Sequence, residues 1–222
     1  SYPISDDHTD EIVAGKWMPG NDEGHFACVS GTEGFFIGDF YGNIVARDMI
    51  GHAQRVSIAN YCPELEGREI VVTNFWGHQG VIFLYDCYGN QIWEMENEMN
   101  GNILAPVNWD GDGTELILTN ADAQKGGLIS GKGIRAVEFP DDGHPVLCCE
   151  SLDLTGDERD ELVVWDYHSM YIYTQDDCPK SQTYHPVQFP IYNASNYRGE
   201  YSYPDASYLD FHADKEKMKE RK

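Results

Sequence analysis

The sequence contains few positive charges and no long apolar run. Only 15 of its 222 residues are Lys or Arg, against 38 Asp or Glu, which leaves a formal net charge of −23. A surface of this charge repels phosphate backbones and anionic headgroups, so nucleic acid and anionic membranes are excluded as expected partners. No apolar run approaches the roughly 18 residues that a membrane-spanning helix needs. The acidity itself is explained equally well by solubility alone and by a calcium-rich environment.

Signature motifs of several enzyme classes are also missing. The sequence has no G-x-S-x-G, P-loop or H-E-x-x-H motif, so no motif supports a serine hydrolase, a nucleotide-binding protein or a zinc protease. Its cysteines show no C-x-x-C spacing and are too scattered for a small disulfide scaffold. We expect them to be packing residues, with one or two disulfides left open and the redox compartment undecided. The six are Cys28, Cys62, Cys87, Cys148, Cys149 and Cys178.

The two ends of the chain suggest its organisation. It starts at Ser1 without an initiator Met, a basic n-region or an apolar h-region, so we expect either a removed signal peptide or, preferably, a piece of a longer chain. Helical periodicity appears only in the charged stretch 208–222. We expect one unit over residues 1–204, a charged tail over 205–222, and a secreted or periplasmic location.

An acidic loop that contains glycine and leads into a short apolar strand recurs along the chain. It is clearest at 108–118 (NWDGDGTELIL), returns at 153–164 (DLTGDERDELVV), and is weaker at 66–72 and 10–14. Such self-similarity at a fixed period is typical of repeat proteins. The glutamates that enter these strands are Glu11, Glu69, Glu115 and Glu161, and the last three are separated by 115 − 69 = 46 and 161 − 115 = 46 residues.

A second repeated marker is the turn D-x-x-G-N, which begins at Asp39 and again at Asp86, 47 residues later. Between an apolar strand and an aromatic or β-branched strand, this turn indicates a β-hairpin. Short strands of alternating or apolar character surround both markers. The expected strands are 11–14, 26–30, 35–38, 55–59, 69–74, 81–85, 91–94, 103–107, 115–119, 133–139, 146–149, 161–165 and 170–174.

A period of about 40–50 residues with four short antiparallel strands is what a β-propeller blade requires. The sequence therefore predicts an all-β protein built of four-stranded blades, with about four blades present. Larger rings are commoner, so we expect the chain to be the C-terminal part of a larger propeller. A β-sandwich with coincidental turn spacing and a solenoid are the alternatives.

The acidic loops are candidates for calcium sites. Calcium binds several oxygen ligands, and carboxylates at alternate loop positions can supply them from one short segment. The alternative is an Asx-type turn without an ion. A calcium ion in such a loop would stiffen a blade and would play no part in catalysis. The expected ligands are Asn108, Asp110, Asp112 and Glu115 in the first loop and Asp153, Asp157 and Glu161 in the second.

Three histidines lie in glycine-containing loops: His52, His78 and His144. A loop histidine is most often an ordinary surface residue. Next to Trp76, however, His78 resembles a sugar subsite, in which an aromatic platform lies beside a proton-transfer group. The stretch 192–204 gathers tyrosines, asparagines and Arg198, which can bind hydroxyls and carboxylates. Its alternative role is that of a packed closing segment.

The second acidic loop carries a family resemblance. The run 153–165 followed by 170–174 resembles the late blades of rhamnogalacturonan lyases of polysaccharide lyase family 11, which show a D-L-x-G-D-x-R-x-E strand, an I-Y-T strand and a closing segment with Y-R, here 192–198. The resemblance covers roughly 103–204. Propellers with integrin-type (FG-GAP-like) calcium repeats share its first half. Asp157-Glu158-Arg159 replaces the G-D-W-R of the lyases, which leaves room for a related lyase family.

The resemblance implies a calcium-dependent, eight-bladed propeller that cleaves a rhamnose- and uronate-containing polysaccharide by β-elimination. A cation or Arg198 would neutralise the uronate carboxylate while a histidine or tyrosine removes the C5 proton. The competing hypothesis is a non-catalytic propeller that binds glycans or proteins, and histidines scattered away from Arg198 would favour it. A third is an inactive fragment. We expect a monomer whose catalytic residues are His78, His144, Tyr197 and Arg198 and whose substrate-binding residues are Asn74, Trp76, Tyr192, Asn193 and Asn196.

Overall fold

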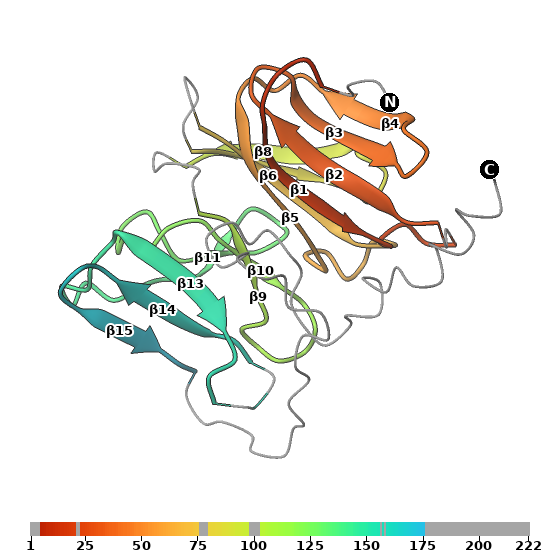
Figure 1. Cartoon of the computed structure of the whole chain (residues 1–222). Coiled ribbons are helices and arrows are strands. Elements are labelled where there is room, and N and C mark those ends of the chain that lie inside the picture. Colours follow the sequence, from red (N-terminus) through yellow and green to blue (C-terminus); the bar gives the residue numbers. More distant parts are fainter. Residues whose placement is uncertain are drawn as a thin grey trace.

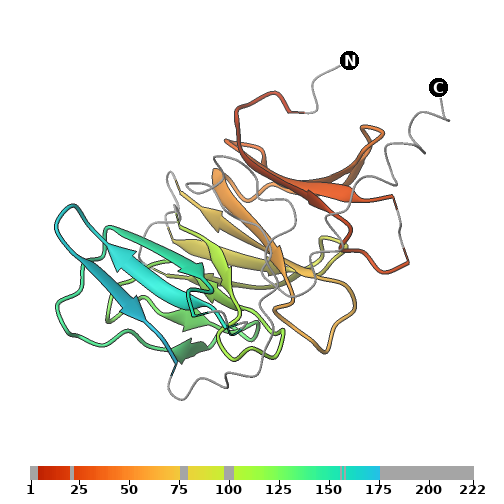
Figure 2. The same cartoon turned by 60° about the horizontal axis from the view of Figure 1, so that its bottom comes forward.

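The protein consists of antiparallel β-sheets that follow one another like the blades of a propeller (Figures 1 and 2). The computed structural model describes residues 5–20, 23–75, 80–97, 103–155, 157 and 159–175. These residues form fifteen strands in four sheets, three of four strands and one of three. No helix capable of crossing a membrane was found in this part of the chain. The all-β, blade-like architecture predicted from the sequence is confirmed.

Blades 1 and 2 are the most regular. Every sheet neighbour in them is also a sequence neighbour, so each blade is a simple meander. Blade 1 contains β1 (Thr9–Gly15), β2 (His25–Ser30), β3 (Gly34–Asp39) and β4 (Ile44–Asp48). Blade 2 contains β5 (Ala53–Ala59), β6 (Glu69–Asn74), β7 (Val81–Tyr85) and β8 (Gln91–Glu96).

Blades 3 and 4 have shorter strands in the same order. The two-residue strand β11 was not predicted, because two residues carry no alternation to detect. Blade 3 contains β9 (Ala105–Val107), β10 (Leu116–Leu118), β11 (Leu128–Ile129) and β12 (Arg135–Val137). Blade 4 contains β13 (Cys148–Leu152), β14 (Glu161–Trp165) and β15 (Met170–Tyr173).

The hairpin turn D-x-x-G-N is confirmed in both places where it was predicted. In blade 2, Asp86 Oδ1 accepts hydrogen bonds from the backbone N–H groups of Tyr88 and Asn90, each at 2.9 Å. The side chain of Asn90 also donates to Asp86 Oδ2 at 2.8 Å. Gly89 lies in the left-handed region at φ 88°, which glycine adopts without steric cost. Asp39 makes the same set of bonds in blade 1.

The first strands of successive blades run beside one another. β1 contacts β5, β5 contacts β9, and β9 contacts β13. Apolar side chains from facing sheets fill the space between blades. One core cluster joins blades 1 and 2 through Phe35 and Ile70, a second joins blades 2 and 3 through Leu84 and Ile117, and a third joins blades 3 and 4 through Leu118 and Leu162.

The structural repeat differs by one residue from the spacing of the glutamates. Glu69 and Glu161 are the first residues of β6 and β14, whereas Glu115 precedes β10, which begins at Leu116. Because side chains alternate between the faces of a strand, Glu115 points to the side opposite to that of Glu69 and Glu161. Glu11 lies within a first strand, β1, and is not an equivalent of the other three. The equal spacing of 46 residues therefore indicated the right fold with the wrong register.

A repeated hydrogen-bonded pair, which we call the inter-blade clasp, links blades 2, 3 and 4. The acidic residue before a second strand pairs with the asparagine that follows the first strand of the preceding blade. Glu115 Oε2 accepts the N–H of Asn60 at 2.7 Å, and the N–H of Glu115 donates to Asn60 O at 2.9 Å. Asp160 and Asn108 repeat this pattern at 2.8 and 3.0 Å. The clasp fixes the positions of blades 3 and 4 on the blades before them.

The cysteines resolved by the structure are packing residues, as predicted. Cys28, Cys62, Cys87, Cys148 and Cys149 are all free thiols, and four of them are buried. Cys178 lies outside the described residues.

The junction between blades 1 and 2 offers a test of this packing. Gly67 has φ 82° and a Cβ there would lie 2.6 Å from Trp17 O, whereas Gly113 has φ 81° and no atom within 4 Å of a Cβ. Gly113→Ala should cost about 1 kcal/mol through the left-handed backbone alone, and Gly67→Ala a further 1–3 kcal/mol, roughly, through overpacking. Urea unfolding of both variants measures the difference. Equal losses would contradict a tight inter-blade contact at Gly67.

Candidate functional site

The first predicted calcium loop forms turns of its own. Asp112 Oδ1 accepts the N–H of Thr114 at 2.8 Å, and Asn108 Oδ1 accepts the N–H of Gly113 at 3.4 Å. Asp110 and Asp112 are exposed, while Asn108 is buried. These contacts are those of an Asx-type turn, the alternative interpretation of the loop.

Glu115 does not point into this loop, because its carboxylate belongs to the inter-blade clasp with Asn60. Its side chain is 2% exposed. Burial raises the pKa of Glu115 to about 8, although the N–H of Asn60 that it accepts acts in the opposite direction. A neutral carboxyl group is a poor ligand for Ca²⁺.

The carboxylates of the second loop are also engaged by the protein. Glu161 Oε2 accepts the N–H groups of Leu154 and Thr155 at 2.7 and 3.1 Å. Asp157 Oδ2 pairs with Arg159 Nη2 at 2.9 Å, and both residues are buried. Within the described part of the chain, neither loop brings three carboxylates into a cluster with ligand atoms within 4.8 Å of one another. Calcium binding by these loops stays a prediction.

The predicted catalytic residue His144 is buried between blades 3 and 4. Its Nδ1 lies 2.7 Å from Asp142 Oδ1 and its Nε2 lies 2.6 Å from Ala121 O. Since both partners accept hydrogen bonds, both ring nitrogens donate, which is the protonated form. Burial lowers the pKa of His144, but the hydrogen bonds to Ala121 and Asp142 outweigh it and raise the pKa above its ordinary value. A histidine held in this way has no free nitrogen for proton abstraction.

The remaining predicted polysaccharide residues are not brought together in the described structure. Asn74 is buried at the end of β6, where its Nδ2 donates to Ile50 O. It lies in blade 2, and no contact between it and His144 was found among the described residues. The predicted residues that lie outside the described part of the chain are Trp76, His78, Tyr192, Asn193, Asn196, Tyr197 and Arg198.

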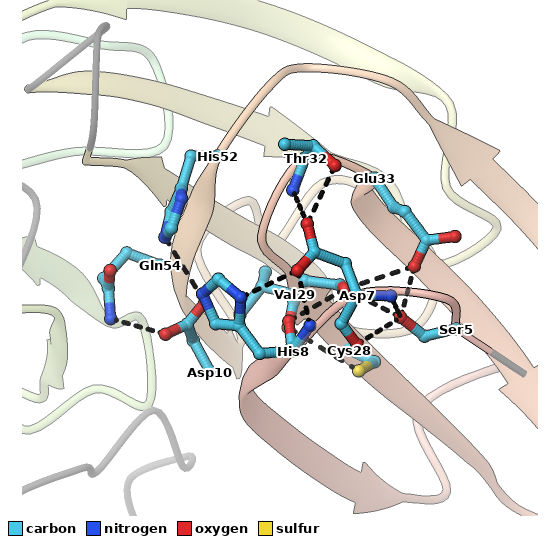
Figure 3. A network of polar contacts seen from close by, with 11 residues as sticks. Ser5, Asp7, His8, Asp10, Cys28, Val29, Thr32, Glu33, His52 and Gln54 are labelled. Carbon is cyan, nitrogen blue, oxygen red and sulfur yellow. Dashed lines mark hydrogen bonds and ion pairs between the residues drawn. The ribbon is translucent and has the colours of Figure 1, made fainter. Parts of the chain in front are cut away.

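A cluster that was not predicted as a site lies where blade 1 meets blade 2 (Figure 3). It consists of His8, Asp10 and His52, whose potential ligand atoms all lie within 4.8 Å of one another. Asp10 Oδ2 is 3.3 Å from His8 Nε2 and 3.4 Å from His52 Nε2. The two imidazole rings are tilted by 55°, with centroids 5.1 Å apart. Among the described residues this is the cluster of His, Cys, Asp and Glu that could hold a metal ion.

Neighbouring side chains orient the cluster. Asp7 Oδ1 lies 2.8 Å from His8 Nδ1, and Asp7 Oδ2 accepts two hydrogen bonds from Thr32 at 2.8 Å each. These bonds from Thr32 hold the pKa of Asp7 well below its usual range, while the bond to Asp7 raises the pKa of His8. Gln54 Nε2 donates to Asp10 Oδ1 at 3.1 Å. Asp10 Oδ1 and His8 Nδ1 are therefore hydrogen-bonded to Gln54 and Asp7. The remaining atoms, Asp10 Oδ2 and His8 Nε2, face the centre of the cluster.

Sequence reasoning noted His52 but missed its partners. His8 and Asp10 are two residues apart, as are His52 and Gln54, so each pair lies on one face of an extended segment. The acidic run around His8 was the available signal. Only the contact between β1 and β5 across the blade boundary shows that the two segments meet.

Comparisons with known proteins support the fold and no more. No protein-family model matches the chain, and no curated protein matches it. Among solved structures, the chain is similar to a crystal structure of BBS1N in complex with ARL6DN, soaked with lead, with a TM-score of 0.54 and 12% identity over 76% of this chain and 50% of that chain. A mercury-soaked crystal of the same complex matches with a TM-score of 0.50 and 13% identity over 74% of this chain and 50% of that one. The chain thus spans about half the length of the propellers that it matches.

The protonation of Glu115 can be tested by the pH dependence of stability. Its pKa is about 8 in the folded protein against 4.5 for an ordinary glutamate, so the folded state binds more protons between these values and loses stability as the pH rises. Glu115→Gln should remove this loss, and the stability of the wild type relative to the variant should fall by about 1 kcal/mol per pH unit from about pH 5 to 8. Urea unfolding across this range, with the exposed Glu94→Gln as control, measures it.

The same variants test the calcium prediction. Calcium that used Glu115 as a ligand would require its ionised form and would stabilise the wild type but not Glu115→Gln. A stability difference that is independent of pH, together with such a selective effect of calcium, would contradict the clasp as the main role of Glu115.

Proposed function

We propose that this chain is a non-catalytic β-propeller segment that binds a protein partner. The similar propeller BBS1N was crystallised in complex with a second protein, ARL6DN, which supports a binding role for such a fold without identifying the partner of this chain. The observation that carries the proposal is an apolar face of blade 1 on which no described sheet packs, called the uncovered face below. Its central side chains Phe26, Cys28 and Phe36 are buried among blade 1 residues, whereas Ile12 at its edge is exposed.

The face is defined by equivalent positions in the four blades. Phe26, Ile70, Ile117 and Leu162 are each the second residue of the second strand of their blade. In blades 2, 3 and 4 this residue packs into a cluster shared with the preceding blade. In blade 1 it belongs to a small cluster of blade 1 residues only, together with Cys28 and Phe36. No preceding sheet covers it within the described structure.

The uncovered face is both apolar and hollow. An open hollow of about 550 Å³ is lined by residues that include Ile12, Ala14, Phe26 and Phe36. The side chain of Ile12 is 60% exposed. Since the equivalent faces of the other blades contact a β-sheet, the shape and composition of this one fit a β-sheet with an apolar surface. We infer that the partner offers such a sheet, for example a further blade of a larger ring.

The lyase predicted from the family resemblance is the competing function. Its candidate base His144 has both nitrogens engaged, and its other candidate catalytic residues lie outside the described structure. No contact among the described residues supports proton abstraction from a uronate. The acidic polysaccharide remains a proposed ligand of the competing hypothesis alone.

Turnover distinguishes the two functions. The chain incubated with calcium and a rhamnose–uronate polymer should release no unsaturated uronyl product, measured by ultraviolet absorbance of the new double bond. His144→Gln should likewise release no product but should lower thermal stability, because it removes the buried hydrogen bond to Ala121 and the partly buried one to Asp142. If the wild type formed product that a chelator abolished and His144→Gln lost 10²-fold or more, the non-catalytic proposal would be wrong.

The uncovered face can be probed with an apolar dye such as ANS. Ile12→Asp should lower dye fluorescence severalfold with little effect on stability, because the side chain is mostly exposed. Ile44→Asp, on the outer strand of the same blade and 39% exposed, serves as the matched control and should retain the signal. Equal fluorescence of all three proteins would mean that the face is already covered, and would overturn the proposed contact.

A further inference from the structure

We propose that His8, Asp10 and His52 form a binding site for one Zn²⁺ ion that joins blade 1 to blade 2. This inference does not depend on the proposed partner binding, because none of the three ligands lines the hollow of the uncovered face, although Asp7, which orients His8, does. Two neutral imidazoles and one carboxylate are a common ligand set for zinc. Imidazole nitrogen is a poor match for calcium, which prefers oxygen ligands.

The separations of the ligand atoms fit tetrahedral zinc. Zinc lies about 2.0–2.2 Å from imidazole nitrogen and carboxylate oxygen. At a tetrahedral angle, two such ligands are then about 3.3–3.5 Å apart. Asp10 Oδ2 lies 3.3 Å from His8 Nε2 and 3.4 Å from His52 Nε2. Two of the three separations therefore match a tetrahedral ion, and the third, between the two histidines, is within 4.8 Å.

The buried atoms of the cluster also lack hydrogen bonds. Asp10 Oδ2 and His52 Nε2 are both shielded from solvent and make no hydrogen bond with any described group. The side chains of Asp10 and His52 are only 15% and 13% exposed. The two atoms face each other at 3.4 Å. Burying polar atoms without hydrogen bonds is unfavourable, and a cation between them would coordinate both. Figure 3 shows the rings of His8 and His52 next to each other, with the side chain of Asp10 close to both.

The surrounding residues have the arrangement that zinc sites use to orient their ligands. Zinc-bound histidines usually donate their other ring N–H to a carboxylate or carbonyl, which fixes the tautomer. Asp7 provides this carboxylate for His8 Nδ1, and the paired bonds from Thr32 hold Asp7 in place. Gln54 holds the second oxygen of Asp10. The nitrogen and oxygen that remain are those directed at the centre of the cluster.

The location of the site gives the ion a structural consequence. His8 and Asp10 belong to the start of blade 1, and His52 directly precedes β5 of blade 2. An ion bound by all three would cross-link segments that are more than 40 residues apart in the sequence. The side chain of His8 is 59% exposed, so solvent can reach the fourth coordination position.

Zinc binding is measured on the whole chain without a histidine tag, after removal of metals by a chelator. Calorimetric titration with Zn²⁺ should show one ion per chain, and Co²⁺ should give visible absorption bands of tetrahedral intensity. Asp10→Asn and His52→Ala should each weaken zinc affinity at least tenfold. Asp7→Asn, which alters only the residue that orients His8, should weaken it by about 10- to 100-fold.

The control is His168→Ala, which removes an exposed histidine in the turn before β15. It should bind zinc like the wild type. Thermal unfolding in chelator shows whether each variant is folded, and zinc should raise the unfolding temperature of the wild type and of His168→Ala only. Similar affinity in all variants, weakened binding in His168→Ala to the same degree, or six-coordinate cobalt spectra would each overturn the proposed site.

Discussion

The structure depends on the need of every blade to cover two apolar faces. Blades 2 and 3 each bury one face against the blade before and the other against the blade after, and a single blade has no such cover when it is alone. At three successive junctions, apolar residues of two neighbouring blades form one cluster, which contains Ile70, Ile117 or Leu162. The inter-blade clasp adds directional hydrogen bonds to this non-directional packing. Apolar burial supplies the stability, and the clasp selects how far one blade is turned relative to the next.

Much of the fold was predictable because it depends on local chemistry. Strand alternation and the D-x-x-G-N turns are encoded within a few residues, and Asp39 and Asp86 form the expected bonds almost identically. The register of the repeat was less accessible. Glu115 looks equivalent to Glu69 in the sequence but precedes its strand by one residue, and this single step changes it from a loop ligand into an inter-blade residue. Because the loops differ in length between blades, equal spacing in the sequence does not show a one-residue shift relative to the strand.

The candidate sites were harder to predict because they depend on contacts between blades. His144 resembled a loop histidine, and nothing near it in the sequence indicates that Ala121 and Tyr173 would enclose it. The cluster of His8, Asp10 and His52 combines two segments that meet only when β1 lies beside β5. Sequence motifs report groups that are close along the chain. In a propeller, the groups that meet at blade boundaries are separated by about one repeat.

The uncovered face of blade 1 also restricts how copies of this chain could associate. The two faces of a propeller blade are different surfaces, so a blade that packed on this face as blades 2 to 4 pack on their predecessors would present its opposite face. Such a contact is heterologous, and it cannot generate a two-fold symmetric dimer in which identical patches meet. Repeated contacts of this type either close into a ring, when the rotation per copy allows it, or continue as an open fibre. The same face that suits the growth of a propeller therefore carries a risk of unlimited polymerisation when it is left exposed.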